Sequence, residues 1–307
     1  HLVRAFERLD GCMQRAPHFQ KAIASRAILA VRCWFFDRVE NNDIDWEAVA
    51  NDCVDAAMRL APDLSDTHLA MAMLVTQRLE IKQATRSLVR AVEINPGSYE
   101  AQEYLGGIEI ETGLIARGIP RLIYATTALP HRPQPCLILS RCYSLLGRHG
   151  EAEAQAAEHH RRSSVPTLGG LLYSLRIHAY SKGRQPYSLT ISQRKAIREN
   201  DWVGVAHYVD VLAGTADSNL ISAWIDRVIP KINNRRAKMV IRQICAELCL
   251  LLGLETKAMT LLADCARDGL IDIFWVDRCP ILAPLRSVEG FGEIRDWVWL
   301  NAYGVWN

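Results

Sequence analysis

The spacing of three prolines limits this chain to a small set of folds. Pro62, Pro96 and Pro130 lie 34 residues apart, and each follows an apolar stretch with helical spacing. Because proline cannot continue a helix, these positions predict three helices that end at one regular interval. A period of this length is typical of an array in which one helical unit recurs along the chain.

The same residue types recur at fixed distances before each proline. Small residues stand five and twelve positions earlier, with a larger apolar residue eight positions earlier: Ala57, Val54 and Ala50, then Ala91, Leu88 and Ala84, then Ala125, Leu122 and Gly118. Small side chains allow two antiparallel helices to approach closely. The pattern therefore predicts stacked antiparallel helix pairs and an all-α fold.

This pattern resembles the tetratricopeptide repeat (TPR), a helix–turn–helix unit of 34 residues. One unit covers about 65–97, and the next, about 99–132, carries the family's Leu-Gly pair at Leu105-Gly106. The resemblance implies an α-solenoid, a TPR-like superhelix.

A third unit begins near Pro133 and has a turn typical of the family at 147–154. Its end departs from the pattern, because His159 stands where a small residue is usual. Upstream, a longer first helix at about 22–39 and an N-capping connector at 41–45 predict an enlarged first unit. We therefore assign residues 1–166 to the array.

Beyond this array the period is lost. Residues 167–230 are predicted to be an irregular helical continuation with a connector at 184–189, and 231–300 a TPR-like helix pair followed by a capping helix. Aromatic residues near Trp275 and Trp297 predict an aromatic cap over the last repeat, as solenoids require. Residues 301–307 are expected to form a tail.

This layout resembles the C-terminal repeat regions of bacterial winged-helix transcriptional activators, class III adenylate cyclases and serine/threonine kinases. The resemblance implies a regulatory module and no chemistry of its own. The chain opens at His1-Leu2 without a methionine, so we expect an effector domain upstream.

Composition excludes several other classes of protein. Lys and Arg number 36 against 34 Asp and Glu, which argues against direct nucleic-acid binding. The nine cysteines are an odd number among apolar residues, which favours buried thiols in a reducing cytoplasm. The longest apolar stretch, 244–254, is interrupted by Glu247 and is too short to span a membrane.

Catalytic motifs are absent from the sequence. Phosphate-binding, nucleophile-elbow, zinc-protease, kinase and cyclase signatures do not occur, so we expect no enzymatic activity and no cofactor. Cys245 and Cys249 share a helix face but lack a second ligand pair, so we expect no metal site. A small molecule held by the irregular helices at 168–230 stays an open alternative.

A TPR array binds partners through a groove lined by the first helix of each unit. In the family's frame the groove residues are Asp66, Leu69, Met73, Gln77, Glu100, Glu103, Glu111, Gln134 and Arg141. The Lys and Asn that bind a peptide's terminal carboxylate in chaperone-binding arrays are missing. Glu100, Glu103 and Glu111 predict an acidic wall, which favours a basic or amphipathic peptide.

Two surface features have open interpretations. Lys182, Arg184, Arg194, Lys195 and Arg198 form a basic group, which indicates a solvated face or a site for an acidic partner. Trp297, Trp299 and Trp306 crowd the end of the chain, where Trp306 is expected to lie beyond the cap.

Together these observations predict a non-catalytic, cytoplasmic module for regulation and protein interaction. It would be the sensor or docking half of a transcriptional activator. The alternatives are the regulatory region of a cyclase or kinase, or a stand-alone adaptor. Its partner would be a protein, a peptide or its own effector domain, with no membrane contact, and a homodimer is an open alternative to a monomer.

Overall fold

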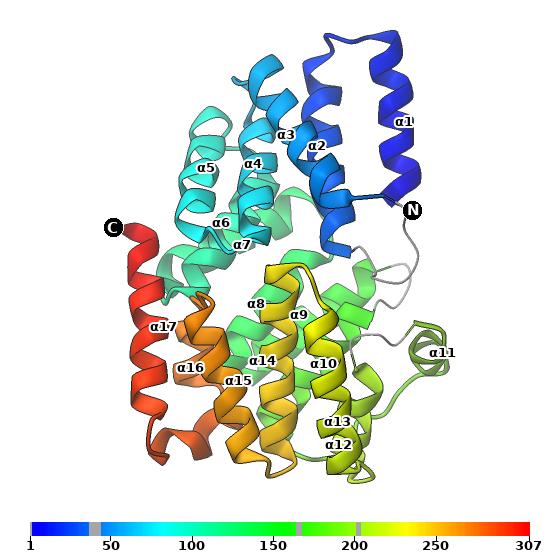
Figure 1. Ribbon diagram of the computed structural model, residues 1–307. Helices are drawn as coiled ribbons and strands as arrows, with labels where there is room; N and C mark the ends of the chain where they lie inside the picture. The colour runs from blue at the N-terminus through cyan, green and yellow to red at the C-terminus, as the bar shows by residue number, and fades with distance from the viewer. Residues whose placement is uncertain (1, 37–43, 164–167, 201–203) are drawn as a thin grey trace. The chain divides into compact units, whose positions relative to one another are not determined.

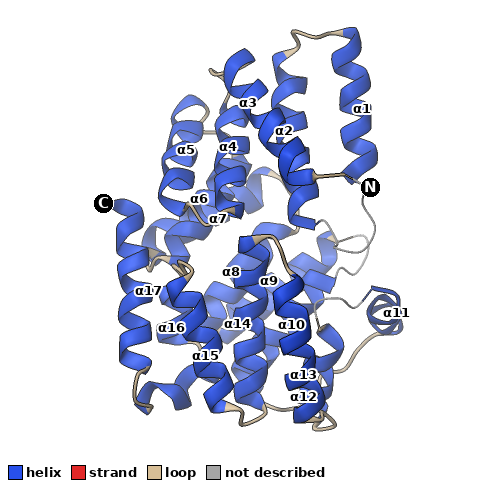
Figure 2. Cartoon of the chain, viewed as in Figure 1, coloured by secondary structure: helices blue, strands red, loops and turns tan. Residues whose placement is uncertain are grey.

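The computed structural model describes residues 2–36, 44–163, 168–200 and 204–307. Within these ranges every regular element is a helix, which confirms the all-α prediction (Figure 1, Figure 2). None of the described helices is both long and apolar enough to cross a membrane.

The helices of the first part are α1 Leu2–Arg15, α2 Gln20–Phe36, α3 Trp46–Leu60, α4 Ser65–Gln77, α5 Ile81–Ile94, α6 Tyr99–Glu111, α7 Ile115–Ala128, α8 Gln134–Leu145 and α9 His149–Arg162. The helices that follow are α10 Leu168–Lys182, α11 Ile191–Asn200, α12 Val205–Ala213, α13 Ser218–Val228, α14 Arg235–Leu251, α15 Glu255–Arg267, α16 Ile273–Arg278 and α17 Phe291–Trp306. Two 3-10 helices, η1 Ile229–Lys231 and η2 Pro280–Ser287, lie among them.

The chain divides into two compact units, each of which is described by itself. The first comprises residues 1–105, 230–238 and 305–307, and the second comprises 106–229 and 239–304.

In the first unit, helices adjacent in sequence pack against each other: α1 on α2, α2 on α3 and α4 on α5. Helix α3 begins where the sequence predicts, because the Asp45 side chain accepts a hydrogen bond from the backbone N–H of Ala48 at 3.0 Å. Residues 41–43 of the predicted connector lie outside the described part. The Phe6 and Trp46 rings meet edge to face at 5.3 Å, so they join α1 to α3.

The small residues of the repeated pattern are buried at helix crossings. The middle residues Val54, Leu88 and Leu122 and the small residues Ala57, Ala91 and Ala125 all have 0% exposure. At Gly118 the crossing with α6 is so close that a Cβ atom would lie 2.6 Å from the Gly106 carbonyl oxygen and 2.6 Å from the Ile110 side chain. The predicted close approach of paired helices is thus confirmed at this position.

The prolines and glycines delimit the helices as expected. Helices α3, α5 and α7 end at Leu60, Ile94 and Ala128, each two residues before its proline. Gly147 and Gly253 have φ angles of +74° and +76° in the turns before α9 and α15. Glycine is favoured in this left-handed region because it has no Cβ atom.

The second unit contains the irregular middle and the end of the chain. Residues 184–190 between α10 and α11 are not helical, in agreement with the predicted connector. Beyond α15, the side chains of Trp275, Leu282 and Leu285 have 0% exposure. These residues belong to the apolar core of this unit.

The prediction of a tail at 301–307 is corrected by the structure. Helix α17 continues to Trp306, and Ala302 and Val305 are buried. The helix persists because these two residues extend the buried face of Phe291 and Val298 at helical spacing. Trp306 is half-buried as part of this helix.

Candidate functional site

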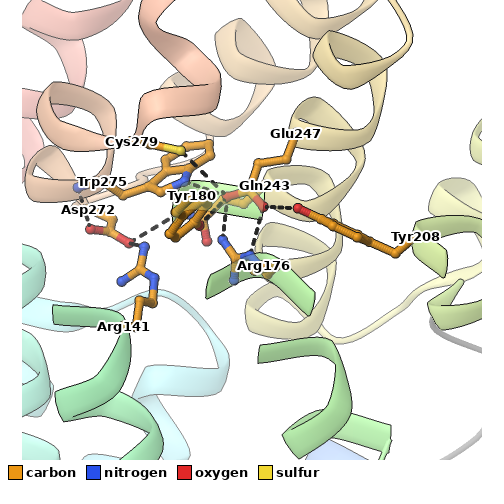
Figure 3. A network of polar contacts seen from close by, with 9 residues as sticks. All are labelled: Arg141, Arg176, Tyr180, Tyr208, Gln243, Glu247, Asp272, Trp275 and Cys279. Carbon is orange, nitrogen blue, oxygen red and sulfur yellow. Dashed lines mark hydrogen bonds and ion pairs between the residues drawn. The ribbon is translucent and has the colours of Figure 1, made fainter. Parts of the chain in front are cut away.

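A buried carboxylate organises the interior of the second unit. Glu247 of α14 has 0% exposure and accepts hydrogen bonds from three other helices (Figure 3). Arg176 of α10 binds it through two bonds, from Nε to Oε2 at 2.8 Å and from Nη2 to Oε1 at 2.7 Å. Tyr180 Oη and Trp275 Nε1 donate to Oε1 at 2.6 and 2.7 Å, and Tyr208 Oη donates to Oε2 at 3.2 Å.

The geometry keeps Glu247 ionised despite its burial. Burial alone would raise the pKa of this carboxyl group, but the Arg176 charge and the hydrogen bonds outweigh it, so the pKa lies below its usual value. Burial raises the pKa of Tyr180 and of Tyr208 well above the ordinary value, so both phenols remain protonated donors. Around Glu247 there are therefore one anion, one cation and neutral donors.

A second buried ion pair lies beside the first. Arg141 Nη2 of α8 donates to Asp272 Oδ2 at 2.6 Å, and Gln243 Nε2 donates to the same oxygen at 3.3 Å (Figure 3). The other oxygen, Oδ1, accepts the backbone N–H of Trp275 at 3.0 Å and so caps α16. Burial lowers the pKa of Arg141, but the Asp272 charge together with the nearby Tyr180 and Tyr173 raises it above its ordinary value, so the guanidinium stays charged.

The two ion pairs connect five segments of the second unit. Residues from α8, α10, α12, α14 and the start of α16 meet in this cluster, which we call the Glu247 network. The network consists of Arg141, Arg176, Tyr180, Tyr208, Gln243, Glu247, Asp272, Trp275 and Cys279. The contacts of these two pairs hold the five segments together, although the buried Nε of Arg141 has no hydrogen-bond partner.

The network is unsuited to catalysis as it stands. Both oxygens of Glu247 already accept hydrogen bonds, and the carboxylate is buried, so it offers no basic lone pair to a substrate. Burial raises the pKa of the neighbouring Cys279 thiol to about 12, so the sulfur is not a nucleophile. Among the described residues no group of three or more His, Cys, Asp or Glu side chains is arranged to hold a metal ion.

The structure distributes the predicted groove residues over three helices. Leu69, Met73, Gln77 and Glu103 are buried, Asp66, Glu100 and Glu111 are half-buried, the Arg141 side chain is only 11% exposed, and Gln134 is exposed. Within the first unit, Asp66 pairs with Lys21 at 2.7 Å and Glu100 pairs with Arg32 at 2.8 Å. The expected acidic wall is therefore partly neutralised by the chain itself, and the partner-binding role of these residues stays a prediction.

Arg141 is the predicted groove residue that belongs to the Glu247 network. The sequence gives its position on α8 but not its partner Asp272, which lies 131 residues away. The signal for Glu247 was visible as a single acid in an apolar helix, because such a charge requires a buried partner. Glu109 of α6 is another buried acid with a cationic partner: it has 0% exposure and accepts a hydrogen bond from Arg121 Nε at 2.9 Å.

No family model matches the chain, and a search among curated proteins finds no relative of it. The function is therefore argued from the residues described above.

Proposed function

We propose that this chain is a TPR-like, non-catalytic module for protein interaction and regulation within a larger signalling protein. The observation that carries the proposal is the 34-residue recurrence of buried crossing positions, from Ala57 to Ala91 to Ala125. Arrays of paired helices serve mainly as extended binding surfaces, because each unit contacts its neighbours and leaves its outer residues free to vary. The α-solenoid architecture is part of this proposal.

The polar groups of the interior support a scaffold in preference to an enzyme. The Glu247 network uses its charged groups to bind helices to one another. Eight of the nine cysteines are buried; they are Cys33, Cys53, Cys136, Cys142, Cys245, Cys249, Cys265 and Cys279. Such groups stabilise a fold and do not act on a substrate.

The sensor or docking half of a transcriptional activator is the more specific form of the proposal. In that role the module binds a partner, or its own effector domain, with different affinity in two states and so shifts the activity of the effector. The partner would be basic or amphipathic, and the site of action the cytoplasm.

The test begins with the native gene upstream of the codon for His1. We expect it to encode a winged-helix domain, and we expect DNA binding or transcription by the whole protein to change when residues 1–307 are removed. A cyclase or kinase domain whose activity depends on residues 1–307 would replace the activator with another effector. An upstream domain that is indifferent to their removal would contradict the regulatory role.

A further inference from the structure

Helix α17 presents an apolar and acidic stripe to solvent. Trp297 and Leu300 are 56% and 58% exposed, although both are large apolar side chains. Glu293 and Asp296 are also exposed and lie on the same face, because positions i, i+3, i+4 and i+7 line one side of a helix. Asp296 has a long ion pair to Arg295 at 3.6 Å, and its side chain remains 74% exposed. We call these four residues the α17 stripe.

Helix α11 presents a complementary stripe with the same spacing. Ile191, Arg194, Lys195 and Arg198 occupy positions i, i+3, i+4 and i+7, and all four are exposed. Ile191 has the largest exposed fraction, 86%, among the large apolar side chains of the described residues. Lys195 has one loose ion pair, to Glu199 at 3.8 Å. We call these four residues the α11 stripe.

The two stripes match in antiparallel orientation. Glu293 to Leu300 and Ile191 to Arg198 both span seven residue steps, about 10.5 Å of helix at about 1.5 Å per residue. Placed antiparallel, Ile191 meets Leu300 and Arg198 meets Glu293.

The two middle positions of each stripe match as well. Lys195 would meet Asp296, and Arg194 would lie against the Trp297 ring, where a guanidinium is attracted to the aromatic face. Every position of one stripe therefore has a suitable partner on the other.

The same copy of the chain cannot make this contact in the described conformation. Both helices belong to the second unit, where they lie at opposite edges with α14 and α15 between them (Figure 1). A contact between the stripes must therefore join two copies.

We propose that the α11 stripe of one copy docks on the α17 stripe of the next, so that copies of this chain associate head to tail. A contact between two different surfaces is heterologous, and it forms a ring or an open chain of subunits. One helix laid on another buries less than the ~1,200–2,000 Å² of a stable interface. The association is therefore weak, grows with protein concentration and weakens with added salt.

The test is sedimentation velocity of the whole chain over a range of concentrations at low salt. Two variants each reverse the charges of one stripe. The first is Lys195→Glu with Arg198→Glu, and the second is Glu293→Lys with Asp296→Lys. We expect either variant alone to lose association about ten-fold or more, because like charges then face each other. Mixing the two variants should restore it, since each altered stripe regains an opposite partner.

Matched controls come from the first unit. Lys82→Glu with Arg86→Glu reverses the charge of two exposed basic residues on α5. Asp52→Lys with Asp55→Lys reverses the charge of two exposed acidic residues on α3. Both controls should associate as the native chain does, and circular dichroism should show equal helix content in all variants. A native chain that stays monomeric at its highest soluble concentration would overturn the proposal. So would association that is unaffected by reversal of the α11 stripe, since this would indicate pairing of α17 with itself.

Discussion

The crossings of the repeated helices and the Glu247 network stabilise this protein in opposite ways. At the crossings, Ala57, Ala91 and Ala125 have no side chain beyond a methyl group, and all three are fully buried. In the network, Glu247 and Arg176 are charged, buried and joined by two hydrogen bonds. The crossings require small side chains, and the network requires that its buried charges stay paired.

This difference determines how each region tolerates change. An overfilled crossing can relax by separating two helices slightly, because no polar group is exposed to an apolar interior. A network that loses one charged member leaves the other buried without a counter-ion, and local relaxation cannot supply one. We therefore expect the network to be the more sensitive region.

The largest effect is expected for Glu247→Leu. The substitution leaves the Arg176 guanidinium, which is 4% exposed, without its counter-ion, so the free energy of unfolding should fall by about 3–5 kcal/mol. Urea denaturation followed by circular dichroism measures this loss. The double variant Glu247→Leu with Arg176→Met removes both charges and should recover much of the stability. A double variant as unstable as the single one would show that the unpaired charge is not the cause, and would assign the loss to packing or to the Tyr180, Tyr208 and Trp275 donors left without an acceptor.

A smaller effect is expected for Gly118→Ala at a crossing. The new Cβ atom would lie 2.6 Å from the Gly106 carbonyl oxygen, so we expect a loss of about 1–3 kcal/mol from overpacking. Gly107 of α6 is the matched control, because a Cβ atom there meets nothing within 4 Å. Gly107→Ala should stabilise the protein by about 0.5–1 kcal/mol through helix propensity. Changes of the same sign in both variants would contradict the close crossing.

Most of the repeated region could be predicted from the sequence because its determinants are local. Pro62, Pro96 and Pro130 mark helix ends, and the small residues before them mark the buried face within the same helix. The end of α17 was predicted six residues too early. Its last turn contains Gly304, which is typical of a helix end, and the burial of Ala302 and Val305 depends on residues distant in sequence.

The Glu247 network could not be predicted because its contacts are distant in sequence. Arg176 lies 71 residues from Glu247, and Arg141 lies 131 residues from Asp272. Helical periodicity places Glu247 on an apolar face but says nothing about which cation reaches it. The groove frame likewise gave the place of Arg141 on α8 but not its ion pair with Asp272.

In the third repeat a titratable residue stands at the position that a small buried residue occupies in the other repeats. His159 stands 34 residues after Ala125 and is 4% exposed, and burial together with the nearby His160 lowers its pKa to about 4. Between pH 6.5 and about 4 the unfolded chain binds a proton at this residue that the folded chain does not, so stability should fall as pH falls through that range.

The slope of this loss can reach about 1.4 kcal/mol per pH unit. It should be smaller in His159→Leu, which has no imidazole to protonate. Urea midpoints at pH 7, 6 and 5 for both proteins measure the difference. Identical slopes would mean that His159 is protonated in the folded state as readily as in the unfolded chain.

The smallest effect is expected for Tyr208→Phe, which removes the longest of the hydrogen bonds that N–H and O–H groups donate to the Glu247 carboxylate, at 3.2 Å. Glu247 keeps both bonds from Arg176 and those from Tyr180 and Trp275, so we expect a loss of only about 1 kcal/mol in the free energy of unfolding. Repeating the substitution in the Glu247→Leu with Arg176→Met background separates the hydrogen bond from the packing of the ring. If the bond is responsible, Tyr208→Phe should cost almost nothing where the carboxylate is absent. An equal cost in both backgrounds would assign Tyr208 to the apolar core, and the network would then be confined to α10, α14 and α16 and the pair that α8 makes with Asp272.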